Sequence, residues 1–402
     1  MAANKQTDWL GLCFDMVEGY MPAACEDREQ VNRFMRISVH AEAVAEYFFW
    51  AAALKADAVK AAELFEKIGD YYDECGVFGN VLSSYFRSLE IREEHLGEKH
   101  PETAIMCDNI GLFFTKTGKH NEAIQWHNRA IAVFEEILGE QHQDTAIAYN
   151  NLGLAYVKQG SYDLAIEWYQ KCLRIDEAIF GYDHVDTAAD YNNIGEALIK
   201  KGDYEAALEH LLKALDIKVR LLGESHPNTA ITYNNLGSAN WRLKKFDEAL
   251  PYHQIAYAIY QETYGEHHPS TALACGNIAS VMASKGDYRE AKRLYARSLE
   301  VGKAILGLFH QETAKNYYNI GTIFYDEKDA KRALPCFLLA YKLFLELFGD
   351  QHEDFILVHK YLFATHDMLR VKEPFPTWLS RETSRPLGDL DAATQAIIWN
   401  GG

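Results

Sequence analysis

The chain has 402 residues, of which 48% are apolar and 24% are charged, as in an ordinary folded protein. Asp and Glu number 58 against 40 Lys and Arg, and the resulting net charge of −18 repels phosphate, so we exclude nucleic acid as a partner. The longest apolar run, residues 47–54, is too short to cross a bilayer, and residues 1–20 lack the features of a secretory signal. We therefore expect no membrane insertion and a cytoplasmic location.

The predicted elements begin with an N-terminal helical cap in residues 1–56, followed by seven tandem units of 42 residues over residues 57–352. Each unit has a signature position filled by glycine, or once by alanine, which in three units completes Asn-Asn-(Leu/Ile)-Gly, and a second glycine that is followed three residues later by histidine. Such a period is typical of solenoids, whose helical units bury their apolar faces by stacking. The signature positions are Gly69, Gly111, Gly153, Gly195, Gly237, Ala279 and Gly321, and the histidines are His100, His142, His184, His226, His268, His310 and His352.

The unit from Asp144 to Gly181 predicts two helices joined by a turn. Tyr149, Leu152 and Tyr156 form the apolar stripe of the first helix. A second amphipathic helix follows and ends at Gly181, which is expected in a left-handed conformation.

The chain leaves the repeats through a lone helix over residues 353–370, which we expect to cap the C-terminal end. Residues 371–402 form a tail that contains Pro374, Pro376 and Pro386. Its acidic and apolar residues suggest an internal ligand for a groove lined by the first helix of each unit, and the alternative is a disordered terminus without contacts.

The pattern Tyr/Cys, Leu-Gly, Tyr/Phe, Gly-x-Tyr/Phe and Ala resembles the tetratricopeptide repeat family. The longer period and the Gly-x-x-His-Pro-x-Thr-Ala link are similar to those of kinesin light chains and of the arrays behind nucleotide-binding switch domains. The resemblance covers residues 57–370. It implies an all-α fold, a right-handed superhelical solenoid of helix-turn-helix units whose first helices line a concave groove.

A row of asparagines lies on the face of the first helices opposite the apolar stripe. An asparagine amide offers donors and an acceptor, so this row could hold the backbone of an extended peptide. These side chains could equally bond to the backbone of the adjacent repeat. The candidate peptide-binding asparagines are Asn109, Asn150, Asn151, Asn192, Asn193, Asn234, Asn235, Asn277 and Asn319.

The same face carries a basic residue in four consecutive units, namely Lys116, Lys158, Lys200 and Arg242. On an acidic protein this row would attract an acidic peptide, although a basic residue at a helix C-terminus also stabilises the helix dipole. Aromatic residues enter the face in later units and could form side-chain pockets: Trp241, Tyr318 and Tyr325.

The repeated histidines do not predict a metal site. Equivalent positions in adjacent units lie about 10 Å apart, whereas a zinc–nitrogen bond is about 2 Å long, so we expect a loop or capping role. His127 and His253 are expected in the core or at an interface. No phosphate-binding, nucleophile or metalloprotease motif is present, and we expect no enzyme activity, no metal and no cofactor.

The chain has seven cysteines and no CxxC pair. Cys107, Cys172 and Cys275 take positions that other units fill with Tyr or Ala. We expect them to be buried and reduced.

These observations favour a non-enzymatic adaptor that binds a linear, acidic peptide segment of a protein partner. Two other functions stay open at this point, a sensor array of a nucleotide-switch system that recognises a folded partner and an oligomerisation scaffold. The sequence contains no P-loop, so a switch module would have to come from another polypeptide. The sequence leaves the oligomeric state open.

Overall fold

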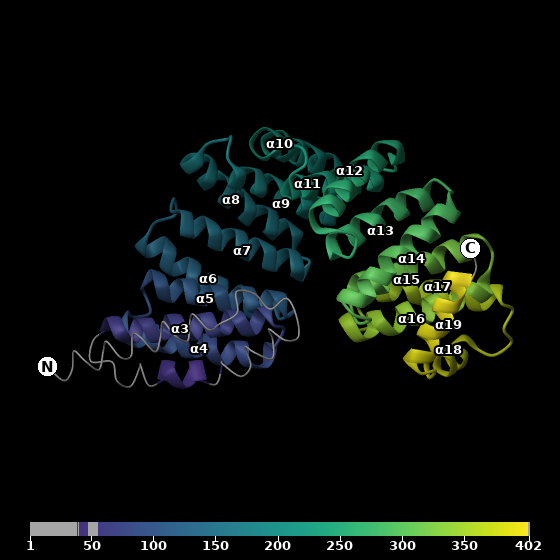
Figure 1. Cartoon of the computed structure of the whole chain (residues 1–402), viewed down its shortest axis with the longest axis horizontal. Coiled ribbons are helices and arrows are strands. Elements are labelled where there is room, and N and C mark those ends of the chain that lie inside the picture. The colour runs from purple at the N-terminus through teal and green to yellow at the C-terminus, as the bar shows by residue number, and fades with distance from the viewer. Residues whose placement is uncertain (1–37, 39, 47–54, 401–402) are drawn as a thin grey trace. The chain divides into compact units, whose positions relative to one another are not determined.

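The computed structural model describes residue 38, residues 40–46 and residues 55–400, so most of the cap expected in residues 1–56 lies outside the described part. Over these residues all regular structure is α-helical, which confirms the predicted fold class. Figure 1 shows the helices as consecutive pairs, followed by α17 (Glu353–Met368), α18 (Phe375–Thr383) and α19 (Leu387–Asn400). The pairs are α3 (Lys55–Glu74) with α4 (Phe78–His95), α5 (Pro101–Lys116) with α6 (His120–Ile137), α7 (Gln143–Gln159) with α8 (Tyr162–Phe180), α9 (Val185–Lys201) with α10 (Tyr204–Leu222), α11 (Pro227–Arg242) with α12 (Phe246–Tyr264), α13 (Pro269–Ser284) with α14 (Tyr288–Ile305), and α15 (Gln311–Asp326) with α16 (Ala330–Phe348).

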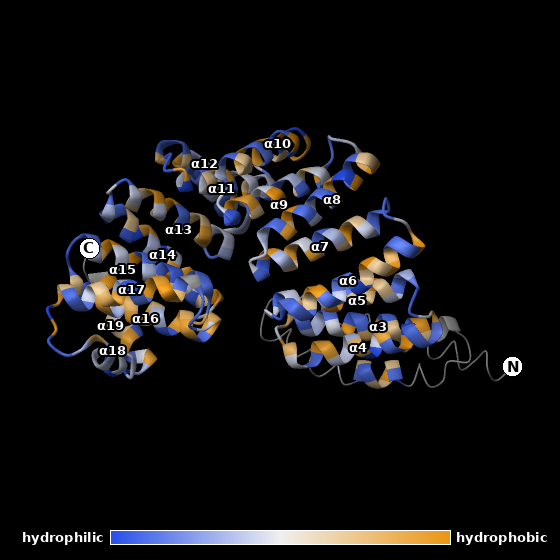
Figure 2. Cartoon of the chain, turned by 180° about the vertical axis from the view of Figure 1, so that it is seen from behind, coloured by the Kyte–Doolittle hydropathy of each residue, from blue (hydrophilic) through white to orange (hydrophobic). Residues whose placement is uncertain are grey.

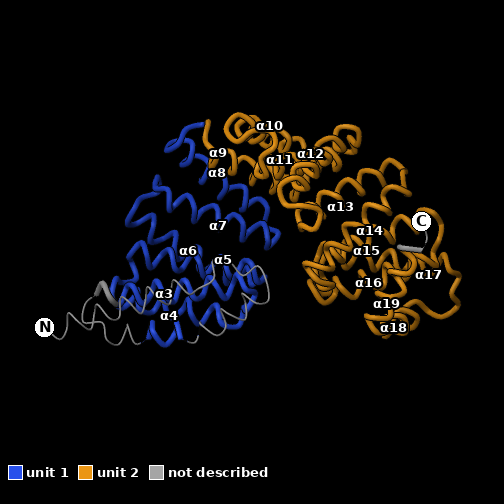
Figure 3. The backbone as a smooth tube through the Cα atoms, in the orientation of Figure 1, with its two compact units in different colours: residues 1–182 blue, residues 183–402 orange. Residues whose placement is uncertain are grey.

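The chain divides into two compact units, residues 1–182 and residues 183–402, which Figure 3 colours separately. Within each unit the second helix of a pair packs on its own first helix and on the next first helix along the chain. Consecutive first helices also touch, α5 with α7 in unit 1 and α9 with α11 in unit 2. The first helices therefore lie side by side within each unit.

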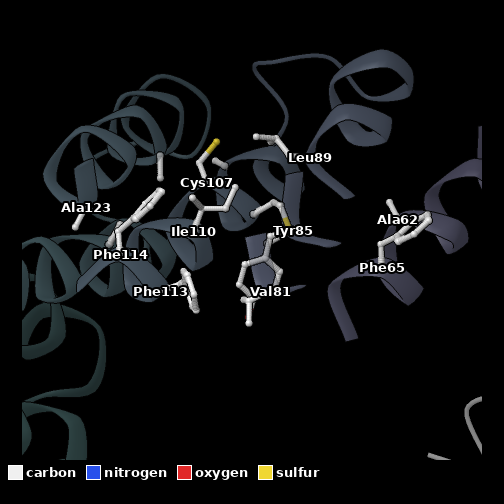
Figure 4. Close-up of a cluster of buried hydrophobic side chains, with 14 of the residues drawn as sticks. Ala62, Phe65, Val81, Tyr85, Leu89, Cys107, Ile110, Phe113, Phe114 and Ala123 are labelled. Carbon is white, nitrogen blue, oxygen red and sulfur yellow. The ribbon is translucent and has the colours of Figure 1, made fainter. Parts of the chain in front are cut away.

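The apolar stripe predicted for the first helices forms the core. Tyr149 and Leu152 of α7 are buried, and Leu236 of α11 is fully buried. Figure 4 shows the same packing in unit 1, where Ile110 of α5 and Tyr85 of α4 belong to one apolar cluster. Figure 2 shows the helices as amphipathic, with apolar residues (orange) and polar residues (blue) on different sides.

The signature glycine is required by direct packing of the second helix on the first. A β-carbon on Gly153 would lie 2.7 Å from the ring of Tyr169 on α8, which is far too close for two carbon atoms. The same approach recurs sixteen residues after each signature glycine: Gly69 with Tyr85, Gly111 with His127, Gly195 with Leu211, Gly237 with His253, and Gly321 with Phe337.

The repeated histidines cap the first helices, as the sequence predicts. The histidine Nδ1 accepts a hydrogen bond from the backbone N–H two residues later, at 3.1–3.3 Å in all seven loops. In five loops the threonine that follows the histidine by three residues donates its hydroxyl to the carbonyl of the loop glycine. Gly139 shows why glycine is needed there, since its φ of 90° is left-handed.

The C-terminal tail folds into α18 and α19, which neither interpretation of the sequence anticipates. The helix α19 packs against α14 and α16, the second helices of the last two pairs, rather than along first helices. Leu390 and Thr394 of α19 are fully buried. The tail is therefore part of the folded C-terminal end.

Asp391 provides the polar contact that holds α19 in place. Its carboxylate pairs with the ammonium of Lys303 at 2.6 Å and accepts the hydroxyl of Tyr317 at 2.5 Å. In unit 1 the equivalent tyrosine, Tyr149, donates its hydroxyl to Glu135 at 2.6 Å. Lys303 occupies the position of Glu135 in the repeat frame, so the tail supplies the carboxylate that this repeat lacks.

Among the described residues the three cysteines singled out from the sequence follow the prediction, and one further cysteine is not reduced. Cys107, Cys172, Cys275 and Cys336 are buried free thiols. Cys75 is disulfide-bonded, so the expectation of reduced cysteines does not hold for this residue. None of the described helices is long and apolar enough to cross a membrane.

Candidate functional site

Each first helix presents one face away from its core stripe. On α7 this face carries Ile147, Asn151, Leu154 and Lys158, which lie within about 60° of one another around the helix axis. Ile147 and Lys158 are exposed, and the two residues between them are half-buried. Val157 on the same helix is buried. We call this surface, on α7 and at the equivalent positions of the other first helices, the first-helix face.

The asparagine row on this face joins consecutive repeats. At four positions the amide nitrogen donates to a side chain 43 residues earlier, on the preceding first helix. The acceptor is a side-chain oxygen and not the backbone that the sequence-based alternative proposed. The pairs are Asn109 with Glu66 (2.8 Å), Asn151 with Asp108 (2.6 Å), Asn235 with Asn192 (3.2 Å) and Asn277 with Asn234 (2.8 Å).

The acceptors of this row are themselves bonded to buried second-helix residues. The Nδ1–H of His127 donates to Asp108 at 2.6 Å, and the Nδ1–H of His253 donates to Asn234 at 3.0 Å. Both histidines are buried, as the sequence predicts. Burial lowers the pKa of His253 to about 4, so this ring is neutral at neutral pH.

Asn192 belongs to an enclosed polar network in unit 2. The residue is buried, and its carbonyl oxygen accepts the hydroxyl of Thr232 at 3.1 Å in addition to the Asn235 amide. The ammonium of Lys218 donates to Thr232 at 3.1 Å and to the carbonyl of Asn228 at 3.2 Å. Burial lowers the pKa of Lys218 to about 8. Asn192 therefore lies behind the surface of the first-helix face.

Asn319 differs from the asparagines that bond to the preceding first helix. Its partner position, 43 residues earlier, is Gly276, which offers no side-chain acceptor. Over the described residues the Asn319 side chain makes no hydrogen bond, and it is half-buried on α15. Asn150 and Asn193 are also half-buried, on α7 and α9 respectively.

The four basic residues are exposed, but they differ in their partners. Lys116 pairs with Asp73 at 2.8 Å, and Lys200 pairs with Glu196 at 3.8 Å. Among the described residues no carboxylate pairs with Lys158 or Arg242. These two cations are therefore the members of the row that can meet an external carboxylate without giving up an internal one.

The charge of Lys158 acts on a neighbouring histidine. Burial, followed by the charge of Lys158, lowers the pKa of the half-buried His120 at the start of α6. The neutral form of this histidine is thus favoured next to Lys158.

The predicted aromatic residues are all engaged in packing. Trp241 is half-buried, and its Nε1–H donates to the hydroxyl of Ser284 at 2.9 Å. Tyr318 and Tyr325 of α15 both pack edge-on against Tyr361 of α17, with ring centroids 5.5 and 5.4 Å apart. Tyr318 and Tyr325 are half-buried, and together with Tyr361 they form one aromatic cluster.

An aliphatic row on the first-helix face is missing from the sequence-based site. It occupies the Ile147 position and its equivalents, where five large side chains are 39–49% exposed. Single exposed aliphatic residues are common and carry no signal on their own, whereas their recurrence at one position of the repeat does, although Ala189 and Lys315 interrupt the row. The row consists of Ile105, Ile147, Ile231, Leu273 and Leu357.

A model of the tetratricopeptide repeat family matches the chain in four overlapping stretches, residues 104–178, 144–218, 186–254 and 228–304. Together these stretches span residues 104–304, which is half of the chain. Comparison with curated proteins gives no match.

Solved structures of low sequence identity are similar in fold. Nearly identical TPR-like repeats of a Podosopora anserina protein named after kinesin light chain align with 20% identity and a TM-score of 0.45, covering 52% of this chain and 98% of that one. BtubC from P. vanneervenii aligns with 21% identity and a TM-score of 0.43, covering 64% and 94%. A signal transduction ATPase from Pyrococcus horikoshii, with a tetratricopeptide repeat sensor, aligns with 15% identity and a TM-score of 0.50, covering 94% and 54%. The chain belongs to the tetratricopeptide repeat family, whose stacked helix pairs form a scaffold suited to protein–protein interaction.

Proposed function

We propose that the chain is a non-enzymatic adaptor whose first-helix face binds an acidic segment of a partner protein. The observation that carries the proposal is the exposed basic row on a protein with a net charge of −18. Local cations on an acidic surface select for carboxylates and give a salt-sensitive attraction. The row is Lys116, Lys158, Lys200 and Arg242.

The aliphatic row supports this proposal because it lies on the same face. Burying an exposed isoleucine or leucine side chain contributes about 1–2 kcal/mol, which is more than an exposed ion pair contributes. The aliphatic side chains on helices that also carry a basic residue, namely α5, α7 and α11, would supply affinity, and the cations would supply the preference for an acidic ligand.

The asparagine row contributes to the proposed binding only through the amide N–H groups that it does not use to join repeats. An amide has two N–H donors, and Asn151 and Asn277 each use one to join repeats, which leaves the second for a ligand backbone. Within the described part of the chain Asn319 has both donors free for a ligand, and we propose it as the asparagine of the row best suited to peptide contact.

The test compares two labelled peptides of equal length, one rich in glutamate and one rich in lysine, by fluorescence anisotropy. We expect the acidic peptide to bind and its affinity to fall as salt rises. Lys158→Glu should weaken its binding about three- to tenfold, because an attraction becomes a repulsion.

The matched control is Arg174→Glu, an exposed position on the second helix α8 that changes the net charge by the same amount. This variant should bind the acidic peptide almost as the parent does. Equal losses from the two variants, or equal binding of the acidic and basic peptides in low salt, would contradict a specific acidic-ligand site on the first-helix face.

A further inference from the structure

The first-helix faces of α5 and α7 form an apolar square with a basic edge. Ile105 and Ile147 occupy one side of the square and are exposed, and Leu112 and Leu154 occupy the other and are half-buried. The two helices touch each other within unit 1. Lys116 and Lys158 lie one helical turn beyond the leucines.

The dimensions of this square follow from helix geometry. Ile147 and Leu154 are seven residues apart, which places them about 10.5 Å apart along α7, and Lys158 lies about 6 Å further on. Packed helices have axes about 8–10 Å apart, so this is the step from α5 to α7. The square is therefore about 10 Å on each side.

An extended ligand does not match these spacings. Side chains on one side of a strand recur about every 6.6–6.8 Å, so they fall out of step with rows about 8–10 Å apart. A helix repeats its heptad positions about every 10.5 Å and is about 10–12 Å wide, so it fits both the step between α5 and α7 and the width between the isoleucine and leucine rows.

We infer that the ligand of the α5–α7 face is an acidic amphipathic helix that lies across both first helices, with its apolar stripe on the square and its carboxylates on the lysine edge. This inference rests on the proposed function and narrows its partner class. Lys158, which has no ion-pair partner among the described residues, provides the main electrostatic contact.

The neighbouring helix α3 sets the direction of the ligand. At the positions equivalent to Ile105, Leu112 and Lys116 it carries Glu63, Asp70 and Glu74, all exposed. These carboxylates repel an acidic side chain and attract the positive end of a helix dipole. The ligand helix therefore ends at α5 with its N-terminus toward α3.

Unit 2 does not repeat this chemistry. The positions equivalent to Leu112 and Leu154 are Glu196, Ser238, Ser280 and Thr322, so the second apolar row is absent there. The helix-binding site belongs to unit 1.

The test uses two synthetic peptides of about three heptads, with identical composition, leucine at the heptad core positions and glutamate on one flank. In the second peptide two D-amino acids at the centre break the helix. Anisotropy titrations should show at least tenfold tighter binding of the helical peptide, and circular dichroism should show a gain of helix on binding. A lysine added at the peptide N-terminus should tighten binding, and one added at the C-terminus should weaken it.

Ile147→Ser should weaken binding of the helical peptide at least about fivefold, because an apolar contact is lost. Leu273→Ser, at the equivalent exposed position of α13 in unit 2, is the matched control and should leave the affinity unchanged. Thermal melts of both variants check that folding is intact, as expected at exposed positions.

Equal affinity of the two peptides would overturn the helical ligand while leaving the acidic-ligand function intact. Binding of neither peptide would overturn both. Equal losses from Ile147→Ser and Leu273→Ser would contradict the placement in unit 1, and tighter binding with the C-terminal lysine would contradict the direction.

Discussion

The first helices of unit 1 and those of unit 2 share the residues that cap and pack them, which we call the common frame. They differ in the chemistry of the first-helix face. Both have the same loop histidine, the same threonine bond and the same signature glycine. On α5 and α7 the first-helix face is aliphatic and basic, whereas at the equivalent positions α15 carries Lys315, Thr322 and Asp326 in place of the isoleucine, the leucine and the lysine. Positions that repeat therefore hold the fold, and exposed positions that change between repeats are those that can select a ligand.

Because the two units share this frame, shortening a core leucine should lower the free energy of unfolding by a similar amount in each unit. Leu152→Ala in unit 1 and Leu236→Ala in unit 2 should each lower the free energy of unfolding by about 2–5 kcal/mol, because both side chains are fully buried between helices. Urea denaturation followed by circular dichroism measures the cost. A change below about 0.5 kcal/mol at either site would show that the units do not share the frame.

A histidine in unit 2 makes stability depend on pH. The folded pKa of His253, about 4, lies below its ordinary value of 6.5, because burial disfavours the charged ring. The unfolded chain then binds more protons, so stability is fully present above about pH 6.5 and is lost as the pH falls toward 4. His253→Phe, which copies Phe337 at the equivalent position, should remove up to about 2 kcal/mol of the stability difference between about pH 7 and pH 5.

The measurement is chemical denaturation of parent and variant at several pH values. The Asn234 oxygen still accepts from Asn277 in the variant, so no buried acceptor is orphaned. A pH dependence identical in parent and variant would show that His253 is solvated in the folded protein.

Two asparagines of the same row test which members stabilise the fold and which are available to a ligand. Asn277→Ala should lower the free energy of unfolding by about 0.5–1.5 kcal/mol, because its bond to Asn234 joins two repeats. Asn319→Ala should change stability by less than about 0.5 kcal/mol, because Gly276 offers it no acceptor. Thermal melts of the two variants, run beside the parent, compare these two losses of stability. A larger loss at Asn319 than at Asn277 would reverse the assignment of structural and free asparagines.

The repeat made much of the fold predictable from the sequence. A single Gly-x-x-His carries little information, but seven copies at one spacing predict the helix ends and the capping role of His142 and its equivalents. The core position of Leu152 follows in the same way from the apolar stripe. Weak local signals become specific when one unit must stack on its copy.

The partners of the asparagines were not predictable, because each acceptor lies on the preceding repeat and varies from Glu66 to Asp108 to Asn192. The contacts of the C-terminal tail were not predictable either. The tail has no repeat, and Asp391 meets Lys303 only because the chain folds back over 88 residues. Contacts between non-equivalent positions leave no period in the sequence.

The central claim is that ligands bind on the first-helix face. Hydrogen–deuterium exchange of the full chain, with and without the acidic helical peptide, tests it most directly. We predict slower exchange in the first helices α5 and α7 on binding, with little change in the second helices α6 and α8. Protection confined to α6 and α8, with α5 and α7 unchanged at saturating peptide, would contradict the claim.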